Sequence, residues 1–175
     1  MTTEYTFKII IIGPAAVGKS SLLRRFVENK FSFDYQFTIG ADFLAKTIEY
    51  EKGKLAKLSI WDVGGQERFK FLRRSFYQGT HGAILVFDLS RAKTFPGLKE
   101  WLTDMNSIIQ KEIPMVIIGN KSDLLPDVGE VIDPKEPQEF AKQHNSFYLT
   151  TSARNGDNVE KAFCDLTNRM LKFYA

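Results

Sequence analysis

The sequence contains very little cysteine and histidine. Among its 175 residues there are one cysteine, Cys164, and two histidines, His81 and His144. A single cysteine cannot form an intramolecular disulfide, and these three side chains cannot supply the ligand set of a structural zinc site. We therefore expect a fold without disulfide or zinc staples, in a reducing compartment.

Long apolar runs and strong charge of one sign are also missing. The apolar runs are far shorter than the roughly 18 residues that span a membrane, and Met1 to Tyr5 has no basic start typical of a signal sequence. The net charge is only +3, and the basic pairs Arg24-Arg25 and Arg73-Arg74 are separated by acids. This pattern favours solvated faces over a nucleic-acid or anionic lipid surface. We expect a cytoplasmic protein with no nucleic-acid partner.

What is present indicates one α/β domain over residues 1–175. Apolar strand-like runs alternate with helical patterns, which predicts an open, six-stranded, mostly parallel sheet with helices on both faces. The connection Glu51 to Gly53 is too short for a helical crossover and predicts an antiparallel hairpin at the sheet edge. We expect a surface loop at Leu124 to Glu130. Strands are predicted at 7–12, 43–50, 54–61, 82–87, 115–119 and 146–149, and helices at 19–28, 69–76, 98–110, 134–144 and 159–173.

The most informative segment is Gly13 to Ser20, which fits the pattern G-x-x-x-x-G-K-[ST]. It follows an apolar run, so a strand leads through a glycine-framed turn into a helix. Such a turn directs backbone N–H groups and a helix N-terminus at one point, which favours polyphosphate. Lys19 can then reach the β and γ phosphates, and the Ser20 hydroxyl can ligate Mg²⁺.

A second loop, Asp62 to Glu67, follows the third predicted strand. Asp62 can hold Mg²⁺ through water, because this small cation keeps several waters and uses few carboxylates. The adjacent Gly64 and Gly65 let the backbone approach a terminal phosphate or change its dihedral angles widely. Gln66 carries both a carbonyl and an amide, so it can orient an attacking water. By itself, however, this segment is equally compatible with an ordinary turn.

Two further loops fit the base of a nucleotide. Asp123, in Asn120 to Asp123, can accept from both N1–H and the exocyclic amine of guanine, whereas adenine offers an acceptor at N1. An unpaired buried carboxylate is costly, which makes such a site selective. Lys121 is expected over the base, and Asn120 is expected to tie the loops together. The segment Thr151 to Arg154 can donate backbone N–H groups to the guanine carbonyl oxygen. Read alone, each segment is a plain polar turn.

Together, these four loops resemble the Ras superfamily of small GTPases, which have the P-loop NTPase fold, over Phe7 to Phe173. Within that superfamily the resemblance is greatest to the Rab branch. The segments that carry it are Ile39 to Phe43, Lys57 to Trp61, Arg68-Phe69, Phe76 to Gly79 and Leu85 to Ser90.

The resemblance assigns expected roles to residues that local reasoning leaves open. Thr38 corresponds to the residue that ligates Mg²⁺ and senses the γ phosphate, Phe31 to the aromatic against the guanine, and Tyr35 to the tyrosine that closes over the phosphates. The implied catalytic residues are Gln66, Lys19 and Gly65. The implied metal ligands are Ser20, Thr38 and, through water, Asp62. The implied GTP-binding residues are Ala15, Ala16, Val17, Gly18, Lys19, Ser20, Ser21, Phe31, Tyr35, Thr38, Gly65, Asn120, Lys121, Asp123, Ser152, Ala153 and Arg154.

The resemblance also implies a switch in membrane trafficking, with GTP/GDP and Mg²⁺ bound and GTP hydrolysed slowly. Residues near 31–43 and 64–76 are the expected switch regions. Phe43, Trp61 and Phe76 correspond to an aromatic triad that contacts effectors, although core packing would also explain them. The implied partners are an exchange factor, a GTPase-activating protein and effectors, with peripheral membrane association as a further expectation. We find no arginine in the sequence obviously placed to act in cis.

The sequence departs from the family pattern at three places. Ala15 and Ala16 stand where many relatives have Gly or Ser, and we expect the Ala15 methyl to slow hydrolysis. Val63-Gly64 replaces the Thr-Ala of most Rabs. The sequence given has no C-terminal cysteine for prenylation, so either it is a piece of a longer chain or this end carries no lipid anchor.

Two other functions remain open from the sequence alone. One is a GTP-dependent binding module or scaffold with negligible hydrolysis, which shares every binding residue and is favoured by the two alanines. The other is an ATP-dependent kinase built on the same phosphate loop. Asn120 to Asp123 argues against the kinase, and no lid or acceptor site for it is apparent in the sequence.

Overall fold

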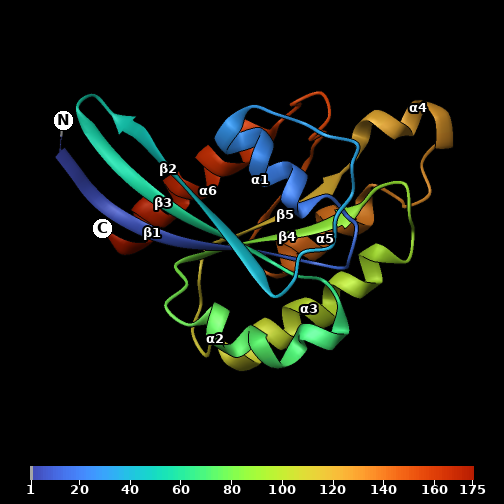
Figure 1. The fold of residues 1–175 in the computed structure, drawn as a ribbon, viewed down its shortest axis with the longest axis horizontal. Coiled ribbons are helices and arrows are strands. Elements are labelled where there is room, and N and C mark those ends of the chain that lie inside the picture. The colour runs from blue at the N-terminus through green and yellow to red at the C-terminus, as the bar shows by residue number, and fades with distance from the viewer. Residues whose placement is uncertain (1) are drawn as a thin grey trace.

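The computed structural model describes residues 2–175, which form a six-stranded sheet in the order β2-β3-β1-β4-β5-β6 (Figure 1). Only β2 and β3 pair in antiparallel fashion, with Ala41 opposite Val63, and every other neighbouring pair is parallel. The predicted α/β fold with an antiparallel edge hairpin is therefore confirmed. The strands are β1 (Thr2–Ile12), β2 (Ala41–Glu51), β3 (Lys54–Val63), β4 (Gly82–Asp88), β5 (Met115–Asn120) and β6 (Phe147–Thr150).

Helices cover both faces of the sheet, as predicted. Helices α1 (Lys19–Glu28) and α6 (Val159–Tyr174) pack on one face, and α3 (Thr94–Ile108) and α5 (Lys135–Gln143) pack on the other. In Figure 1 the first two lie above the sheet, while α3 and the short α2 (Arg73–Tyr77) lie below it.

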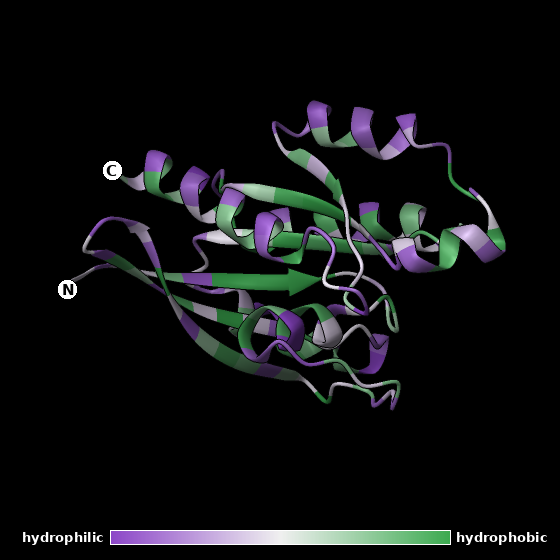
Figure 2. Ribbon diagram, turned by 90° about the horizontal axis from the view of Figure 1, so that it is seen from above, coloured by the Kyte–Doolittle hydropathy of each residue, from purple (hydrophilic) through white to green (hydrophobic). Residues whose placement is uncertain are grey.

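The central strand β1 explains why its sequence is an unbroken apolar run. Ile9 and Ile11 belong to the buried cluster under α1 and α6, whereas Ile10 and Ile12 belong to the cluster under α3 and α5. Alternate residues of a strand point to opposite faces, so a strand covered on both sides needs apolar residues at every position. Figure 2 shows the central strands mostly in hydrophobic green and the helices banded in purple and green.

Several predicted boundaries were wrong, and each has a physical reason. β1 begins at Thr2 rather than at Phe7, because its polar first residues pair with the start of β3. α3 begins at Thr94 rather than at Leu98, since Pro96 lies in the first helical turn, where no intrahelical N–H bond is lost. The helix predicted at 69–76 is a 3₁₀ segment, η1 (Glu67–Leu72), followed by α2.

The predicted surface loop at 124–130 was also wrong in part. The structure has a 3₁₀ turn, η2 (Ser122–Leu124), followed by the four-residue helix α4 (Leu125–Val128). Pro126 lies in the first turn of α4 and Gly129 ends it with φ of +74°. Proline near the start and glycine just past the end are typical helix signals, so the composition that predicted a loop is equally that of a short capped helix.

The parallel pairing brings the polar loops together. Strands β1, β3, β4, β5 and β6 all run in the same direction, so the loops that follow them meet at one edge of the sheet. β2 runs the opposite way, which places the segment before it, residues 29–40, at the same edge. Within residues 2–175, no helix combines the length and the apolar character that crossing a bilayer requires.

Candidate functional site

The loop after β1 has a backbone that requires glycine at both of its ends. Gly13 and Gly18 have φ of +147° and +100°. A Cβ at Gly13 would lie 2.1 Å from the Val86 carbonyl oxygen, and one at Gly18 would lie 2.2 Å from Asn120 Nδ2. Ala16, between them, also has a positive φ of +63°, a left-handed conformation that costs alanine roughly 1 kcal/mol. The loop is therefore fixed by close approach to its neighbours.

Lys19 begins α1 and lies over the same loop. Its side chain is buried, with the residue only 6% exposed, and Nζ donates to the carbonyl oxygens of Gly13 and Pro14 at 2.9 Å each. Burial lowers the pKa of Lys19 to about 8, although the nearby Asp62 carboxylate opposes this shift. A desolvated ammonium at the start of a helix is well placed to attract a polyphosphate.

Three oxygen-bearing side chains converge beside the lysine. Ser20 Oγ hydrogen-bonds to Asp62 Oδ2 and lies 3.0 Å from Thr38 Oγ1, which donates to the same carboxylate oxygen at 3.2 Å. Asp62 is 2% exposed, and its second oxygen, Oδ1, has no hydrogen-bond partner among residues 2–175. Burial raises the pKa of Asp62, while the Ser20 hydroxyl and the Lys19 charge act against it.

This oxygen cluster fits a small divalent cation. Hydroxyl and carboxylate oxygens are the ligands that Mg²⁺ prefers, and an unpartnered buried carboxylate oxygen is costly unless a cation or donor satisfies it. Within residues 2–175 no group of three or more His, Cys, Asp or Glu side chains is arranged to hold a metal. The two hydroxyl groups offer oxygen ligands that further carboxylates would offer in a purely acidic site. The structure thus brings Ser20, Thr38 and Asp62 together, as predicted.

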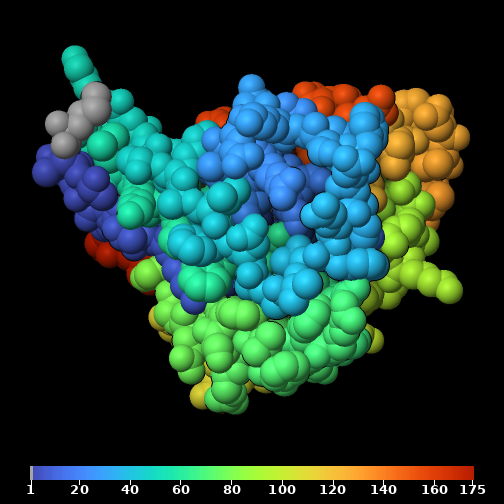
Figure 3. Space-filling view, viewed as in Figure 1, coloured from blue at the N-terminus to red at the C-terminus, as the bar shows by residue number. Residues whose placement is uncertain are grey.

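Two glycines join the segments on either side of this cluster. Gly64 N donates to Gly40 O at 2.7 Å, and a Cβ on Gly64 would lie 2.5 Å from Thr38 O. A Cβ on Gly65 would lie 2.6 Å from the backbone nitrogen of Ala15. Gly64 thus explains the Val-Gly departure in the sequence: alanine at this position does not fit the backbone arrangement seen here. Figure 3 shows the blue-to-cyan segment before β2 on the near face, beside green atoms of the segment after β3.

Gln66 lies next to this junction but points elsewhere. Its Oε1 accepts from Arg68 Nε at 2.7 Å. The Gln66 side chain is therefore engaged by Arg68, and its role in orienting water stays a prediction.

The loop after β5 is bonded to the loop after β1, residues 13–18, which we call the phosphate loop after its predicted ligand. Asn120 is 1% exposed, and its Nδ2 donates to Val17 O at 3.0 Å, while its Oδ1 accepts from Thr151 Oγ1 at 2.9 Å. Lys121 Nζ donates to Ala16 O at 2.9 Å. Asn120 therefore ties together three loops, as predicted from the sequence.

Asp123 faces the loop after β6. Its Oδ1 accepts from Ser152 Oγ at 2.8 Å, and its Oδ2 lies 4.0 Å from an Arg154 guanidinium nitrogen. The Arg154 guanidinium also lies over the Phe33 ring, 5.1 Å from its centroid, and Phe33 contacts Phe31 edge-on. The predicted carboxylate and the aromatic residue expected against the base thus lie at the same end of the site.

The remaining predicted residues occupy the surroundings of the site. Ser21 lies in the first turn of α1, and Tyr35 is exposed and packs edge-on against Phe37. Phe43 stacks on Trp61 at 5.2 Å between centroids, and Trp61 lies 6.1 Å from Phe76.

The three members of the aromatic triad are therefore contiguous. Phe43 is 53% exposed, whereas Trp61 and Phe76 pack against the second buried cluster. Core packing accounts for part of the triad, and its contact with effectors stays a prediction.

Sequence reasoning missed three residues of the site. Asp88 ends β4 and accepts from Lys121 and Arg91. Arg25, on α1, donates to the carbonyl oxygens of Ala153 and Arg154, so it holds the loop after β6. An acid directly after an apolar strand is the same signal that identified Asp62, and it would have found Asp88. The other two missed residues, Arg25 and Arg91, carry no comparable signal in the sequence.

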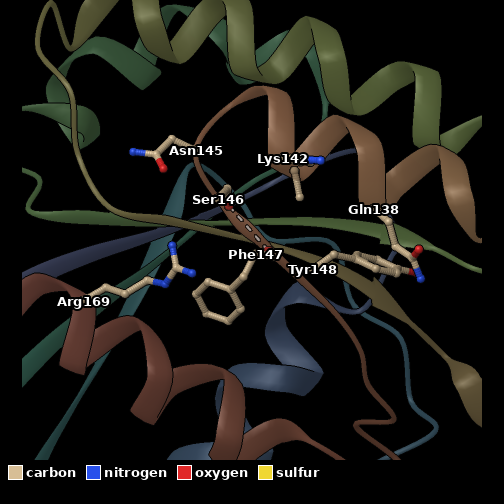
Figure 4. Close-up of a pocket in the computed structure, with 8 residues that line it drawn as sticks. Gln138, Lys142, Asn145, Ser146, Phe147, Tyr148 and Arg169 are labelled. Atoms are coloured by element: carbon tan, nitrogen blue, oxygen red, sulfur yellow. Dashed lines mark hydrogen bonds between the residues drawn. The ribbon is translucent and has the colours of Figure 1, made fainter.

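A surface hollow lies away from all of these residues, between α5, β6 and α6. It is lined by Gln138, Ala141, Lys142, Asn145, Ser146, Phe147, Tyr148 and Arg169. Figure 4 shows Arg169 and Phe147 side by side, and the guanidinium lies 4.4 Å from the ring centroid. None of the predicted site residues lines this hollow, so the candidate site is the loop cluster and not the hollow.

Comparison with known proteins agrees with the geometry. Residues 8–172 match the model of the Ras family. The chain is 41% identical to Ras-related protein Rab-4A of Mus musculus over 97% of this chain and 77% of that protein, and 41% identical to Ras-related protein Rab-4B of Homo sapiens over 97% and 78%. It is also 40% identical to Ras-related protein RABA4b of Arabidopsis thaliana, over 95% of this chain and 73% of that protein.

Proposed function

This chain belongs to the Ras family, and we propose that the loop cluster at the carboxyl edge of its sheet binds GTP and GDP with Mg²⁺ and carries out its GTPase reaction. Its relatives place it on the Rab branch. The protein is accordingly a small GTPase that converts GTP to GDP and phosphate as a switch in membrane trafficking. The residue roles below belong to the proposal.

One observation carries the proposal above the others. Asn120 and Lys121 donate to the carbonyl oxygens of Val17 and Ala16, at 3.0 and 2.9 Å. These bonds hold the loop suited to guanine directly against the loop suited to phosphates. A single ligand that carries both a guanine base and phosphates fits such an arrangement, because the two loops suited to these groups are hydrogen-bonded to each other.

The phosphate end of the site uses fixed donors. Backbone N–H groups of residues 15 to 21 and the Lys19 ammonium would hold the phosphates, while Ser20, Thr38 and, through water, Asp62 would hold Mg²⁺. When bound, Mg²⁺ supplies positive charge that neutralises the phosphate oxygens.

The base end of the site selects guanine. The Asp123 carboxylate accepts from the guanine N–H groups, and the backbone of Ser152, Ala153 and Arg154 lies where it can donate to the guanine carbonyl oxygen. Phe31 and Lys121 flank the base. An adenine in the same position would leave the carboxylate without its donors, which is costly in a partly buried site.

Hydrolysis requires Gln66 to change partner. In the structure Gln66 Oε1 is held by Arg68 Nε. We propose that Gln66 leaves Arg68 to orient the attacking water, while Thr38 and the Gly65 N–H contact the γ phosphate. Loss of those two contacts after cleavage lets residues near 31–43 and 64–76 relax, which alters the surface that partners bind.

Regulators and effectors are the partners that family membership implies. We propose that Phe43, Trp61 and Phe76 form the effector surface, because they are contiguous and Phe43 is largely exposed. The proposal also includes an exchange factor, a GTPase-activating protein, and a cytoplasmic location with peripheral membrane contact.

A single-turnover assay tests the hydrolytic role. Protein loaded with GTP is followed for GDP formation, beside the variant Gln66→Leu and the control Gln110→Leu, which changes an exposed glutamine just beyond the end of α3. We expect Gln66→Leu to lose most of the rate and Gln110→Leu to retain it. Equal rates for Gln66→Leu and the unaltered protein would favour a GTP-dependent scaffold instead.

The Ala15 methyl is the proposed cause of slow turnover. Gly65 packs against the Ala15 backbone, so the methyl lies beside the loop from which Gln66 must act. We expect Ala15→Gly to hydrolyse GTP faster in the same assay, alone and with an activating partner. If both rates are unchanged, the methyl has no part in limiting hydrolysis.

A further inference from the structure

Arg91, just beyond the end of β4, reaches the phosphate loop. Its Nε donates to Asp88 Oδ2 at 3.0 Å and its Nη2 donates to the Ala15 carbonyl oxygen at 3.1 Å. Lys121 makes a matching pair of contacts, with Nζ 2.9 Å from Asp88 Oδ2 and 2.9 Å from Ala16 O. One carboxylate oxygen thus anchors two cations, and each cation holds one of two successive loop carbonyls.

The Asp88 carboxylate that anchors both cations is itself held rigidly. It is fully buried, and its Oδ1 accepts from the Ser90 backbone N–H at 2.8 Å and from the Ser90 hydroxyl at 2.6 Å. Burial by itself raises the pKa of Asp88, but the bonds from Ser90 and Lys121 outweigh it, so the pKa lies below its ordinary value. The carboxylate therefore has both oxygens occupied, and its direction is fixed.

Anchoring a carbonyl also orients the N–H group of the same peptide. In a trans peptide the C=O and N–H bonds point in opposite directions. Holding Ala15 O against Arg91 therefore turns the Ala16 N–H away from the guanidinium, and holding Ala16 O against Lys121 does the same for the Val17 N–H. The two anchored carbonyls flank Ala16, whose φ of +63° is unfavourable for alanine.

We propose that Arg91 is a positioning residue for nucleotide binding: by fastening Ala15 O to Asp88, it keeps the phosphate loop in the conformation that receives phosphates. This inference rests on the proposed function. A guanidinium is needed because two of its nitrogens, Nε and Nη2, donate at the same time to Asp88 and to Ala15 O, and its planar group fixes their relative positions. A lysine ammonium at the same position is a point charge on a flexible stem, which cannot reproduce that planar arrangement.

Release of a fluorescent GDP analogue tests the proposal, measured in Mg²⁺ for the unaltered protein, Arg91→Ala, Arg91→Lys and Arg24→Ala. Arg24 is an exposed arginine on α1, so Arg24→Ala controls for the loss of one positive charge. We expect release to be about tenfold faster for Arg91→Ala, at least threefold faster for Arg91→Lys, and changed less than twofold for Arg24→Ala.

Each outcome decides a separate point. Release from Arg91→Ala within twofold of the unaltered protein overturns the positioning role. Release from Arg91→Lys at the rate of the unaltered protein contradicts the need for the guanidinium, because a positive charge alone would then suffice. Thermal unfolding of each GDP-loaded variant separates positioning from general destabilisation, because Arg91 is about half exposed and we expect a small change in melting temperature. Failure of the unaltered protein to bind the GDP analogue would contradict the proposed function itself.

Discussion

The two ends of the site differ in how well their buried polar groups are satisfied. At the base end, Asn120 and Asp123 have partners on the neighbouring loops. At the other end, which we call the switch end and which comprises Asp62 and the segment from Gly64 through α2, four side-chain atoms are buried without a hydrogen-bond partner. They are Asp62 Oδ1, Arg73 Nε, Arg73 Nη2 and Tyr77 Oη, and they are the only such side-chain atoms within residues 2–175. These atoms belong to Asp62 and to α2, which lie in or directly beside the region 64–76 that is expected to change with the bound nucleotide.

We propose that this difference separates a scaffold part of the site from a part that responds to the ligand. A buried polar group without a partner costs roughly 1–3 kcal/mol, so the switch end has free energy to gain from a cation or from rearrangement. Arg73 illustrates this: its guanidinium lies 3.6 Å from the Trp101 ring centroid and 3.3 Å from Asp104. Its Nε and Nη2 nevertheless lack a hydrogen-bond partner within residues 2–175, and the Glu67 carboxylate lies 3.8 Å from Nη2. The base end has little to gain, so we expect it to be nearly complete before any ligand arrives.

The largest expected effect comes from breaking the scaffold. Asn120→Ala removes the bonds to Val17 O and Thr151 Oγ1 and leaves both partners buried and unpaired. We expect GTP affinity to fall about 100-fold or more, measured by equilibrium titration with a fluorescent analogue. The control is Asn106→Ala, at an exposed position on α3, for which we expect affinity within twofold. A fall of less than fivefold for Asn120→Ala would mean that the base end is not the rigid half.

Removing Mg²⁺ acts on the responsive end. In the cluster of Ser20, Thr38 and Asp62, Mg²⁺ would satisfy Asp62 Oδ1 and would add positive charge beside the phosphates, so chelation is expected to weaken phosphate binding. We expect EDTA to accelerate GDP release about 30-fold. In Ser20→Ala, release is expected to be fast already and to change little on chelation. Release that does not depend on Mg²⁺ in the unaltered protein would contradict the assignment of this cluster.

A substitution between the two switch segments has a somewhat smaller effect. In Gly64→Ala the new Cβ would lie 2.5 Å from Thr38 O and 2.9 Å from Gly40 O, so the two backbones must separate. We expect single-turnover hydrolysis to fall about tenfold, while GDP affinity changes less than threefold. Gly53→Ala, in the open hairpin turn far from the site, controls for glycine replacement and is expected to leave hydrolysis unchanged. Equal loss of GDP affinity and hydrolysis would show that Gly64 supports binding in general.

The smallest expected effect concerns the loop between the two ends. Ala16 has a left-handed backbone and Ala15 does not, so the two neighbours form a matched pair. We expect Ala16→Gly to increase the free energy of unfolding of the GDP-loaded protein by about 1 kcal/mol, and Ala15→Gly to give no gain. Denaturant unfolding measures both. A gain for Ala15→Gly as large as that for Ala16→Gly would contradict the backbone assignment.

The fold was largely predictable because the central strands are covered on both faces. The runs in β1, β4 and β5 are apolar at nearly every position, which is a strong signal. The start of β1 was missed because its first residues are polar and owe their conformation to pairing with β3. The sequence pattern predicts one helix at 69–76 because it does not distinguish a 3₁₀ turn from an α-helix, whereas the structure has η1 followed by α2.

The candidate site was predictable where a sequence motif stands at the carboxyl end of a strand. Lys19, Asp62, Asn120 and Asp123 belong to such motifs, and the structure brings their segments to one edge of the sheet. Arg91 and Arg25 were missed because they act by donating to backbone carbonyls of distant loops, and no residue pattern marks the recipient of such a bond. The orientation of Gln66 toward Arg68 is likewise a property of the folded surface.

The most direct test of the central claim is the identity of the nucleotide that the purified protein carries. The protein is denatured, and the released small molecules are separated by chromatography against guanine and adenine nucleotide standards. We predict one guanine nucleotide, GDP or GTP, for each molecule of unaltered protein, and a much smaller amount for Asn120→Ala. Adenine nucleotide in the unaltered protein would contradict the assignment of Asp123 and with it the account of the site.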